Sequence, residues 1–254
     1  MMHLMEQPER AASLFEGWEE TMIWSCLSGM MGRIYANADV SAAVAVLGDF
    51  AFFGGSADAE TAAFLPAECL RSGMMLIPQN DAWDRALAAA WNGRAKRRMR
   101  YAIRKEPEVF DREQLARLAR VPDGFMLSRI DRRLYAQCLA EGWTKDLAGC
   151  FADADDFAAH GLGVVLLREG RIASGASSYS AFPGGIEIEI DTRRDLRRQG
   201  LAAVCGANLI LDCLARGLYP SWDAQNLTSV HLAQRLGYHF DREYPIYELT
   251  AEAE

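Results

Sequence analysis

The N-terminal half of the chain alternates between apolar stretches with helical spacing and stretches that are almost continuously apolar. Residues 13–31 repeat apolar side chains every four positions, which predicts a helix that buries the stripe Leu14, Trp18, Met22 and Cys26. Residues 42–53 are rich in apolar and aromatic side chains and are followed by Gly54-Gly55. We therefore expect a strand pair there, with its turn at Gly48-Asp49.

Shorter elements continue this alternation up to a basic stretch. Met74–Ile77 predicts a buried strand ended by Pro78, and residues 81–92 predict a helix with Trp83, Leu87 and Ala90 on one face. The following residues include seven cations: Arg94, Lys96, Arg97, Arg98, Arg100, Arg104 and Lys105. These cations form either a patch for an anionic ligand or the solvated face of a helix or strand.

A second alternating region begins after a predicted domain boundary at residues 106–123. Asp111 is expected to cap a short helix that runs to Arg120. Residues 125–130 predict a strand and residues 132–140 a helix; further strands are expected at 162–167, 172–179 and 186–190, joined by tight turns as an antiparallel meander. The predicted fold class is α/β or α+β, a mixed and mostly antiparallel sheet flanked by helices, with domains at 1–110 and 120–254.

The last strand of this meander separates apolar from acidic side chains. Because side chains alternate along a strand, Ile186, Ile188 and Ile190 point to one face. The other face carries Glu187, Glu189 and Asp191. This acidic face is either exposed to solvent or holds a general base beside an electrophile. The strand leads directly into an arginine-rich turn, and this position favours the base.

The turn has the features of a phosphate-binding strand–loop–helix unit. Gly200 lets the backbone approach an oxygen-rich ligand, and the helix that begins there offers unpaired N–H groups and the positive end of its dipole. Four arginines lie in the turn: Arg193, Arg194, Arg197 and Arg198. We interpret Arg193 and Arg194 as ordinary surface charge. The helix at residues 201–215 is apolar nearly all round, so we expect it to be buried and to end at Gly217.

Composition narrows the classes of function. The 254 residues carry a formal net charge of −8, which argues against a general nucleic-acid binder because phosphate backbones need a broad basic surface. The six cysteines form no CxxC pair and the four histidines show no metal-type spacing, so we expect reduced cysteines and no metal. No apolar run reaches membrane-spanning length, and the N-terminus lacks the secretory-signal pattern. We expect a cytoplasmic protein that binds neither nucleic acid nor membrane.

Two motifs in order resemble the GNAT superfamily of N-acetyltransferases. The residues Arg197-Arg198-Gln199-Gly200-Leu201-Ala202 are similar to its R/Q-x-x-G-x-G/A signature. Its later N-x-x-S-x-x-L-A-x-x-L-G-Y/F helix is matched by Asn226, Ser229, Leu232, Ala233, Leu236, Gly237 and Tyr238. The resemblance covers about residues 120–250 and includes a final strand pair at 239–249. More loosely, the IDT strand end, the PSWDAQN segment and the long N-terminal half resemble the subgroup of zwittermicin-type antibiotic-resistance acetyltransferases.

The resemblance implies acetyl-CoA as co-substrate and a set of site residues. The pyrophosphate is expected on the turn formed by Arg197, Arg198, Gln199, Gly200, Leu201 and Ala202. A backbone N–H at Ile190, Asp191 or Thr192 is expected to bind the oxyanion. Asn226 and Ser229 are expected to contact the pantetheine or to cap the helix. Glu189 is the first candidate for the general base and Glu187 the second.

The sequence departs from the family pattern at the general acid. Many members have a tyrosine where this chain has Ala233; Tyr238, Tyr244, Tyr247 or water could replace it. Two functions remain: an N-acetyltransferase for the primary amine of a small molecule, with residues 1–110 on the acceptor side, and a non-catalytic acyl-CoA-binding sensor. The identity of the amine and the formation of a homodimer are left open.

Overall fold

The computed structural model describes residues 1–250 and divides the chain into two compact units. Unit 1 contains Met1–Arg100 together with the chain from Glu243 onward, and unit 2 contains Tyr101–Arg242. The boundary between the units lies at residue 100, and most of the last strand belongs to the first unit, whereas the sequence predicts domains at 1–110 and 120–254. Two strands, β6 (Ala95–Ile103) and β13 (Phe240–Leu249), contribute residues to both units.

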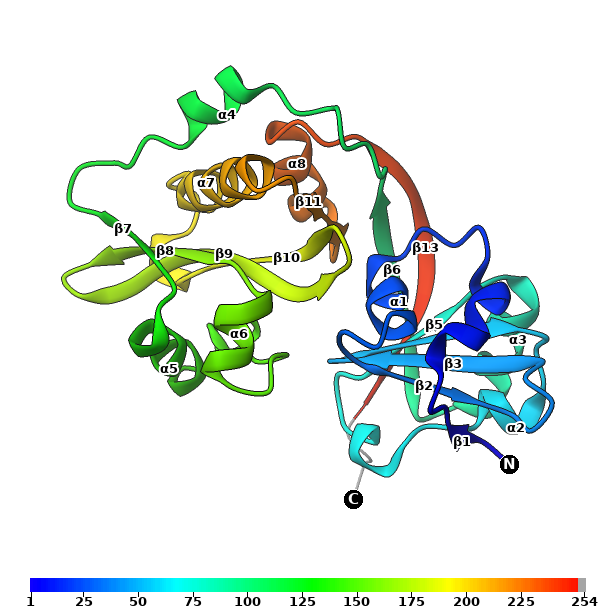
Figure 1. Ribbon diagram of the computed structural model, residues 1–254. Helices are drawn as coiled ribbons and strands as arrows, with labels where there is room; N and C mark the ends of the chain where they lie inside the picture. Colours follow the sequence, from blue (N-terminus) through cyan, green and yellow to red (C-terminus); the bar gives the residue numbers. More distant parts are fainter. Residues whose placement is uncertain (251–254) are drawn as a thin grey trace. The chain divides into compact units, whose positions relative to one another are not determined.

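The sheet of unit 1 is mainly antiparallel (Figure 1). Its strands are β1 (His3–Leu4), β2 (Arg33–Ala36), β3 (Ala42–Leu47), β4 (Phe50–Gly55) and β5 (Met75–Pro78). The predicted strand pair is confirmed, because β3 and β4 pair from Ala42↔Gly55 to Leu47↔Phe50. β5 lies parallel to β4, and β13 is antiparallel to β5 through Tyr247↔Leu76. The C-terminal strand thus completes the N-terminal unit.

Short helices accompany this sheet. They are η1 (Pro8–Phe15), α1 (Thr21–Leu27), α2 (Ala59–Ala62), η2 (Ala67–Cys69) and α3 (Asp81–Ala90). The single helix predicted over residues 13–31 is wrong, because the chain turns at Gly17, whose φ of +75° is left-handed. The predicted helix at 81–92 is confirmed as α3, with Asn80 Oδ1 accepting from the N–H of Trp83.

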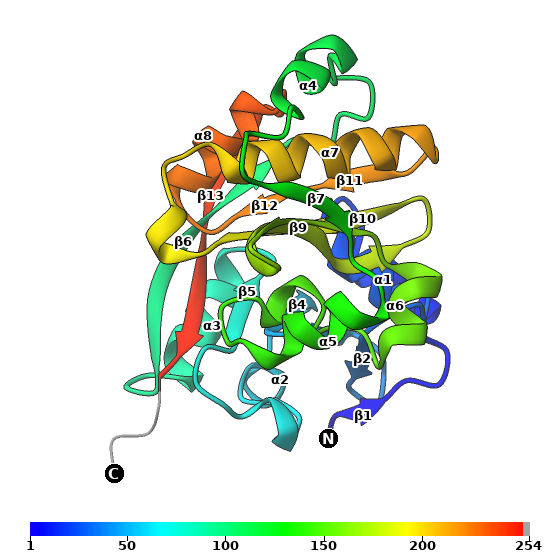
Figure 2. The same cartoon turned by 90° about the vertical axis from the view of Figure 1, so that its left-hand side faces the viewer.

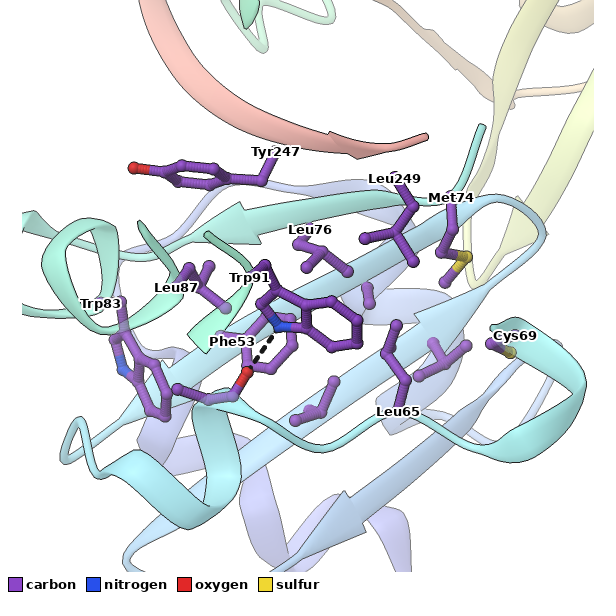
Figure 3. Packing of buried hydrophobic residues seen from close by; sticks show 14 of the residues in the cluster. Phe53, Leu65, Cys69, Met74, Leu76, Trp83, Leu87, Trp91, Tyr247 and Leu249 are labelled. Carbon is purple, nitrogen blue, oxygen red and sulfur yellow. Dashed lines mark hydrogen bonds between the residues drawn. The ribbon is translucent and has the colours of Figure 1, made fainter. Parts of the chain in front are cut away.

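An aromatic core fills unit 1 (Figure 3). The ring of Phe53 lies 5.7 Å from that of Trp83, and Trp91 Nε1 donates to the carbonyl of Ala62 at 2.8 Å. Tyr247 and Leu249 of β13 are buried in the same cluster. Tyr247 also donates its hydroxyl to Asp84 Oδ1 at 2.6 Å. The last residues of β13 are therefore part of this core.

Unit 2 contains a sheet with strand order β11-β10-β9-β8-β7. The bounds are β7 (Met126–Arg129), β8 (Gly163–Arg168), β9 (Arg171–Phe182), β10 (Gly185–Thr192) and β11 (Tyr219–Ser221). The predicted meander is confirmed, because β7 to β10 pair antiparallel in sequence order. β11 instead lies parallel to β10. The predicted final strand pair is wrong, because residues 240–249 form the single strand β13.

Helices cover both faces of this sheet (Figures 1 and 2). One face carries α7 (Leu201–Ala215) and α8 (Leu227–Arg235), with α4 (Arg112–Leu118) outside α7. The other carries α5 (Arg132–Ala140), η3 (Lys145–Leu147) and α6 (Ala154–His160). Asp111 caps α4 as predicted, accepting from the N–H of Gln114. The short strand β12 (Asp223–Ala224) leaves the sheet and pairs with β6 at Tyr101 and Ala102.

Candidate active site

The strands β10 and β11 separate halfway along β10. Their parallel pairing runs from Gly185↔Tyr219 to Glu187↔Ser221, where β11 ends, while β10 continues to Thr192. The chain after β11 pairs with β6 through β12 instead. A strand that continues beyond its neighbour offers backbone N–H and C=O groups to an extended ligand, which can bind as an additional strand. The separated part of β10 is the first component of the site.

The two faces of β10 are used as the alternation predicts. A Cβ built on Gly206 of α7 would lie 3.0 Å from Ile190 Cδ1, so the isoleucine face packs on α7. The acidic face lies toward η3. Its cross-strand partners include Ser177, whose hydroxyl donates to the carbonyl of Leu147, and Gly175, where a built Cβ would lie 2.6 Å from Leu147 Cδ1.

The acidic face is not a freely solvated one. Glu187 is 4 % exposed, and Glu189 and Asp191 are half-buried. The pairing register shifts between Glu187 and Ile188, where β9 carries the extra residue Tyr179. Such a bulge increases local twist and redirects side chains. The structure thus holds three carboxylates at one face of a single strand, partly withdrawn from water.

Asp191 has the most perturbed ionisation on this face. Partial burial raises its pKa to about 6, and the like charge of Asp146 acts in the same direction. The cation of Arg197 and the N–H of Thr192 lower it. The Arg193 N–H donates to Ala173 of β9, so in the same register the Asp191 N–H also faces β9. Because the Thr192 N–H is turned to the Asp191 carboxylate, Ile190 is the best placed of the three backbone donors for an oxyanion. The sequence analysis assigns Asp191 a backbone role, and its place as the third acid in the alternation is the signal that also points to its side chain.

A buried leucine and two arginine contacts stabilise the turn after β10. Leu196, in η4 (Arg194–Leu196), is buried at 4 % exposure and anchors the turn. Arg193 pairs with Asp195 at 2.8 Å, and Arg197 Nε donates to the carbonyl of Thr192 at 3.2 Å. The interpretation of Arg193 as ordinary surface charge therefore fits its ion pair. Arg198 adopts a left-handed φ of +65° at the exposed tip.

Gly200 forms the N-terminus of α7 without a side-chain cap. Its φ of +81° and ψ of 0° are left-handed, and a Cβ there would meet no atom within 4 Å, so backbone conformation rather than space requires glycine. The first N–H groups of a helix have no acceptor within the helix, and glycine has no side chain to supply one. Leu201 and Ala202 therefore present backbone N–H groups and the positive dipole end to an anion.

The two predicted contacts from α8 also maintain local structure. Asn226 Oδ1 accepts from the N–H of Ser229 at 3.0 Å, which confirms that Asn226 caps the helix. The hydroxyl of Ser229 accepts from Trp222 Nε1 at 3.2 Å. Trp222 itself is 4 % exposed. A pantetheine contact by either residue stays a prediction.

The tyrosine candidates are tied to other groups. Tyr238 is 2 % exposed and donates its hydroxyl to the carbonyl of Pro220 at 2.7 Å. Its ring packs edge-on against Phe110 and Trp222, and burial raises its pKa well above the usual value. Its contacts are those of a core anchor, so we propose no proton transfer through Tyr238. Tyr247 lies in unit 1.

Cysteine and metal chemistry find little support in the described residues. Burial raises the pKa of Cys138, Cys205 and Cys213 to about 12, so these thiols keep their protons at neutral pH and do not serve as nucleophiles. Across residues 1–250, no group of three or more His, Cys, Asp or Glu side chains is arranged to hold a metal ion. In the same residues no helix has the length and apolar character to span a membrane.

Comparisons with known proteins show the family of the chain. Residues 12–247 match the family described as GNAT acetyltransferase. A crystal structure of a GCN5-related N-acetyltransferase-like protein from Streptococcus suis 89/1591 is 43% identical, covers 96% of this chain and 99% of that one, and has a TM-score of 0.90. A GCN5-related N-acetyltransferase from Kribbella flavida shares the fold, with a TM-score of 0.54 at 14% identity over 97% of this chain and 96% of that one.

A curated relative gives weaker support. The uncharacterized N-acetyltransferase YdfB of Bacillus subtilis (strain 168) is 27% identical over 181 residues, which is 68% of this chain. The match spans 64% of that protein's length. The GNAT fold implies the use of an acyl-CoA. On the match of residues 12–247, the chain belongs to the GNAT acetyltransferase family.

Proposed function

We propose that this chain is an N-acetyltransferase that moves the acetyl group of acetyl-CoA to a primary amine of a small molecule. The observation that carries the proposal is the position of β10. Its half-buried acidic face, its separation from β11 and the uncapped helix N-terminus at Gly200 follow one another within sixteen residues, Gly185–Gly200. A base, a site for an extended ligand and a site for an anion thus lie on one continuous segment.

The reaction begins with removal of a proton from the amine. An alkylamine with a pKa of about 10.4 is almost entirely protonated at neutral pH, so it must lose a proton before it attacks. Glu189 accepts this proton directly or through one water, with Glu187 as the alternative. The nitrogen lone pair then attacks the thioester carbonyl carbon, and the backbone N–H of Ile190 stabilises the oxyanion. The nitrogen then gives its second proton to water, the C–S bond breaks, and the thiolate of CoA takes up a proton from water.

The acyl donor is positioned by the turn. The N–H groups at Leu201 and Ala202, with the side chains of Arg197 and Arg198, supply positive charge for the pyrophosphate in a chain of net charge −8. The pantetheine arm extends along the separated part of β10. Deprotonation and acyl transfer therefore occur at the same strand.

A non-catalytic acyl-CoA sensor is the second candidate. Ala233 is fully buried where many relatives carry a tyrosine, and the nearby Tyr238 hydroxyl is bound to Pro220. The half-buried carboxylates favour the enzyme, because partial burial of acids costs stability that simple ligand binding does not require. The resemblance to zwittermicin-type enzymes, the acceptor-side role of residues 1–110 and a homodimer stay predictions.

Acetyl-CoA binding is tested by thermal unfolding. At about 100 times its Kd the ligand should stabilise the protein by about 2.7 kcal/mol and raise the Tm by about 5–10 °C. Gly200→Asp should abolish the shift, since it places a carboxylate at the anion site. Gly170→Asp is the matched control: its φ of +76° is also left-handed and open, but it lies in the β8–β9 turn. Absence of a shift in the wild-type chain would contradict both candidate functions.

Catalysis is tested by release of free CoA thiol with a panel of primary amines. We expect turnover with the wild-type chain and a loss of about 100-fold or more in Glu189→Gln, because general-base catalysis contributes about 10²–10⁴-fold. Gln keeps the shape of the side chain, and the acetyl-CoA thermal shift should persist. Turnover by Glu189→Gln at the wild-type level would remove Glu189 as the base, and Glu187→Gln would then be the decisive variant.

A further inference from the structure

A row of buried polar side chains crosses three strands of unit 2 where β10 and β11 separate. Ser180 of β9 lies opposite Glu187 of β10, and Glu187 lies opposite Ser221, the last residue of β11. Residues paired across strands point to the same face of a sheet, so the three side chains form one row. All three are buried. The row lies two residues before Glu189, the proposed base.

The hydroxyl of Ser180 differs from the other hydroxyls of its strand. Among the residues that the structure describes, Ser180 Oγ has no hydrogen-bond partner, although the side chain is fully buried. Buried hydroxyls nearly always have a partner, because leaving one unsatisfied costs stability. The other three serines of β9, Ser174, Ser177 and Ser178, all donate to main-chain carbonyls. The exception at Ser180 therefore requires an explanation.

A bulge places this hydroxyl opposite the buried carboxylate. The register of β9 and β10 shifts between Glu187 and Ile188, where β9 carries the extra residue Tyr179. Regular pairing would put Tyr179 opposite Glu187, whereas the bulge puts Ser180 there. Directly opposed Cβ atoms lie about 4.5–5.5 Å apart, so rotation about one side-chain bond of Ser180 brings its Oγ within reach of the carboxylate.

A hydroxyl suits a carboxylate that changes its protonation state. It donates its hydrogen to the ionised form and accepts one from the protonated form, so it serves both forms without movement of any other group. The proposed reaction contains such a change, because the amine nitrogen loses two protons. Glu189 takes the first proton, before the attack. The second leaves the tetrahedral intermediate.

We propose that Glu187 takes up the second proton by way of one water, and that Ser180 is the positioning residue that holds its carboxylate before and after this transfer. The inference rests on the proposed acetyltransferase function. The positively charged nitrogen of the intermediate gives its proton to the water, and the water gives a proton to the ionised Glu187. The C–S bond breaks to leave a neutral amide. Glu187 then returns its proton to solvent.

The proposal is tested by the kinetics of thiol release at saturating acetyl-CoA and amine. We expect Ser180→Ala to lower kcat by about 10-fold or more and to leave KM for acetyl-CoA unchanged, because a hydrogen bond to a charged group shifts an equilibrium by about this factor. Ser180→Thr keeps the hydroxyl and should recover part of the rate. Ser178→Ala is the matched control, since it removes a buried hydroxyl of the same strand that bonds to the main chain of Leu162. It should leave kcat unchanged.

A double-mutant cycle with Glu187→Gln separates positioning from a general effect on folding. If Ser180 acts through Glu187, Ser180→Ala should cause little further loss of kcat once Glu187 is replaced. Equal losses of kcat in both backgrounds would overturn the proposal. A wild-type kcat in Ser180→Ala would overturn it as well.

Urea unfolding at pH 7.5 tests the pairing of the two side chains without turnover. We expect Ser180→Ala to lower the urea midpoint more in the wild-type chain than in Glu187→Gln, because the hydroxyl bonds more strongly to a charged partner. If no amine is acetylated, this coupled loss would support the role of Ser180 at Glu187 and leave the error in the proposed function. A Ser180→Ala variant that is neutral or stabilising in both backgrounds would reject the inference independently of turnover.

Discussion

At the scale of single residues, the most informative side chain is that of Asp191, because the partial burial of its carboxylate lowers the stability of the folded protein. Asp191 has a folded-state pKa of about 6, whereas an unperturbed aspartate has about 3.9. Between these values the folded state binds more protons than the unfolded state, so this residue makes the protein less stable as pH rises from about 4 to 6. Above pH 6 the full cost is present.

Replacing this acid should therefore stabilise the chain in a pH-dependent way. We expect Asp191→Asn to raise the free energy of unfolding more at pH 7.5 than at pH 5, as measured by urea denaturation. The partial exposure of the side chain limits the size of the gain. Asp123→Asn, the same substitution at an exposed position of the same unit, is the matched control. An equal gain at both pH values would mean that the carboxylate is not destabilised by its surroundings.

The sequence predicts which side chains share a face of β10 better than it predicts what surrounds them. The alternation of Ile190 with its acidic neighbours defines which side chains share a face, because the period of a strand is local information. It does not reveal that Asp191 is partly buried or that Asp146 lies near it, since η3 is about forty residues away in the chain. Tyr238 lies within the family motif in the sequence, which suggests a role in the site. In the fold its hydroxyl donates to the carbonyl of Pro220, a contact that the sequence does not reveal.

At the scale of elements, α7 connects the proposed anion site to the strand with the carboxylates. Gly206 allows this contact, because a Cβ at this position would lie 2.8 Å from Leu236 Cδ1 and 3.0 Å from Ile190 Cδ1. Glycine within a helix costs about 0.5–1 kcal/mol relative to alanine. The close approach of α7 to β10 and α8 is the structural reason for this residue.

Gly206→Ala should consequently destabilise the protein despite its better helix propensity. Overpacking a core costs about 1–3 kcal/mol, which exceeds the gain in propensity. We expect a net loss of about 1–2 kcal/mol in urea denaturation, from the difference of these two effects. In a double-mutant cycle, Leu236→Ala should absorb part of the loss, because the two side chains share the contact. Additive effects would show that the helix shifts instead.

The predicted elements succeed where the pattern is local and fail where it is not. The strands β3, β4, β8, β9 and β10 follow from apolar runs bounded by turns. The helix expected at 13–31 fails at Gly17, since a four-residue repeat does not register a left-handed residue that interrupts it. The pairing of β13 with β5 could not be predicted, because the two segments lie about 170 residues apart.

At the scale of the whole molecule, both units show the same order of strands. In unit 1, the antiparallel β2, β3 and β4 are followed by α2 and then by β5 parallel to β4. In unit 2, the antiparallel β8, β9 and β10 are followed by α7 and then by β11 parallel to β10.

The helix that follows the repeated strands differs between the two units. The helix after β4 is only four residues long and is capped by Asp58, whose carboxylate accepts from the N–H of Thr61. A negative charge at a helix N-terminus opposes phosphate binding. The proposed phosphate-binding turn of unit 2 therefore has a counterpart in unit 1 whose helix N-terminus is already occupied by a carboxylate.

The last strand should make the stability of unit 1 depend on the C-terminal end of the chain. Leu249 is 6 % exposed, and its N–H donates to the carbonyl of Met74 at 2.8 Å. We expect Leu249→Ala to cost about 2–5 kcal/mol, the usual range for a buried leucine. Hydrogen exchange should lose protection first at β5 and α3, whereas Leu227→Ala, at a position 55% exposed, should change little. Unchanged protection at β5 would mean that β13 pairs with the sheet without stabilising its core. The predicted domain at residues 1–110 would then be stable without β13.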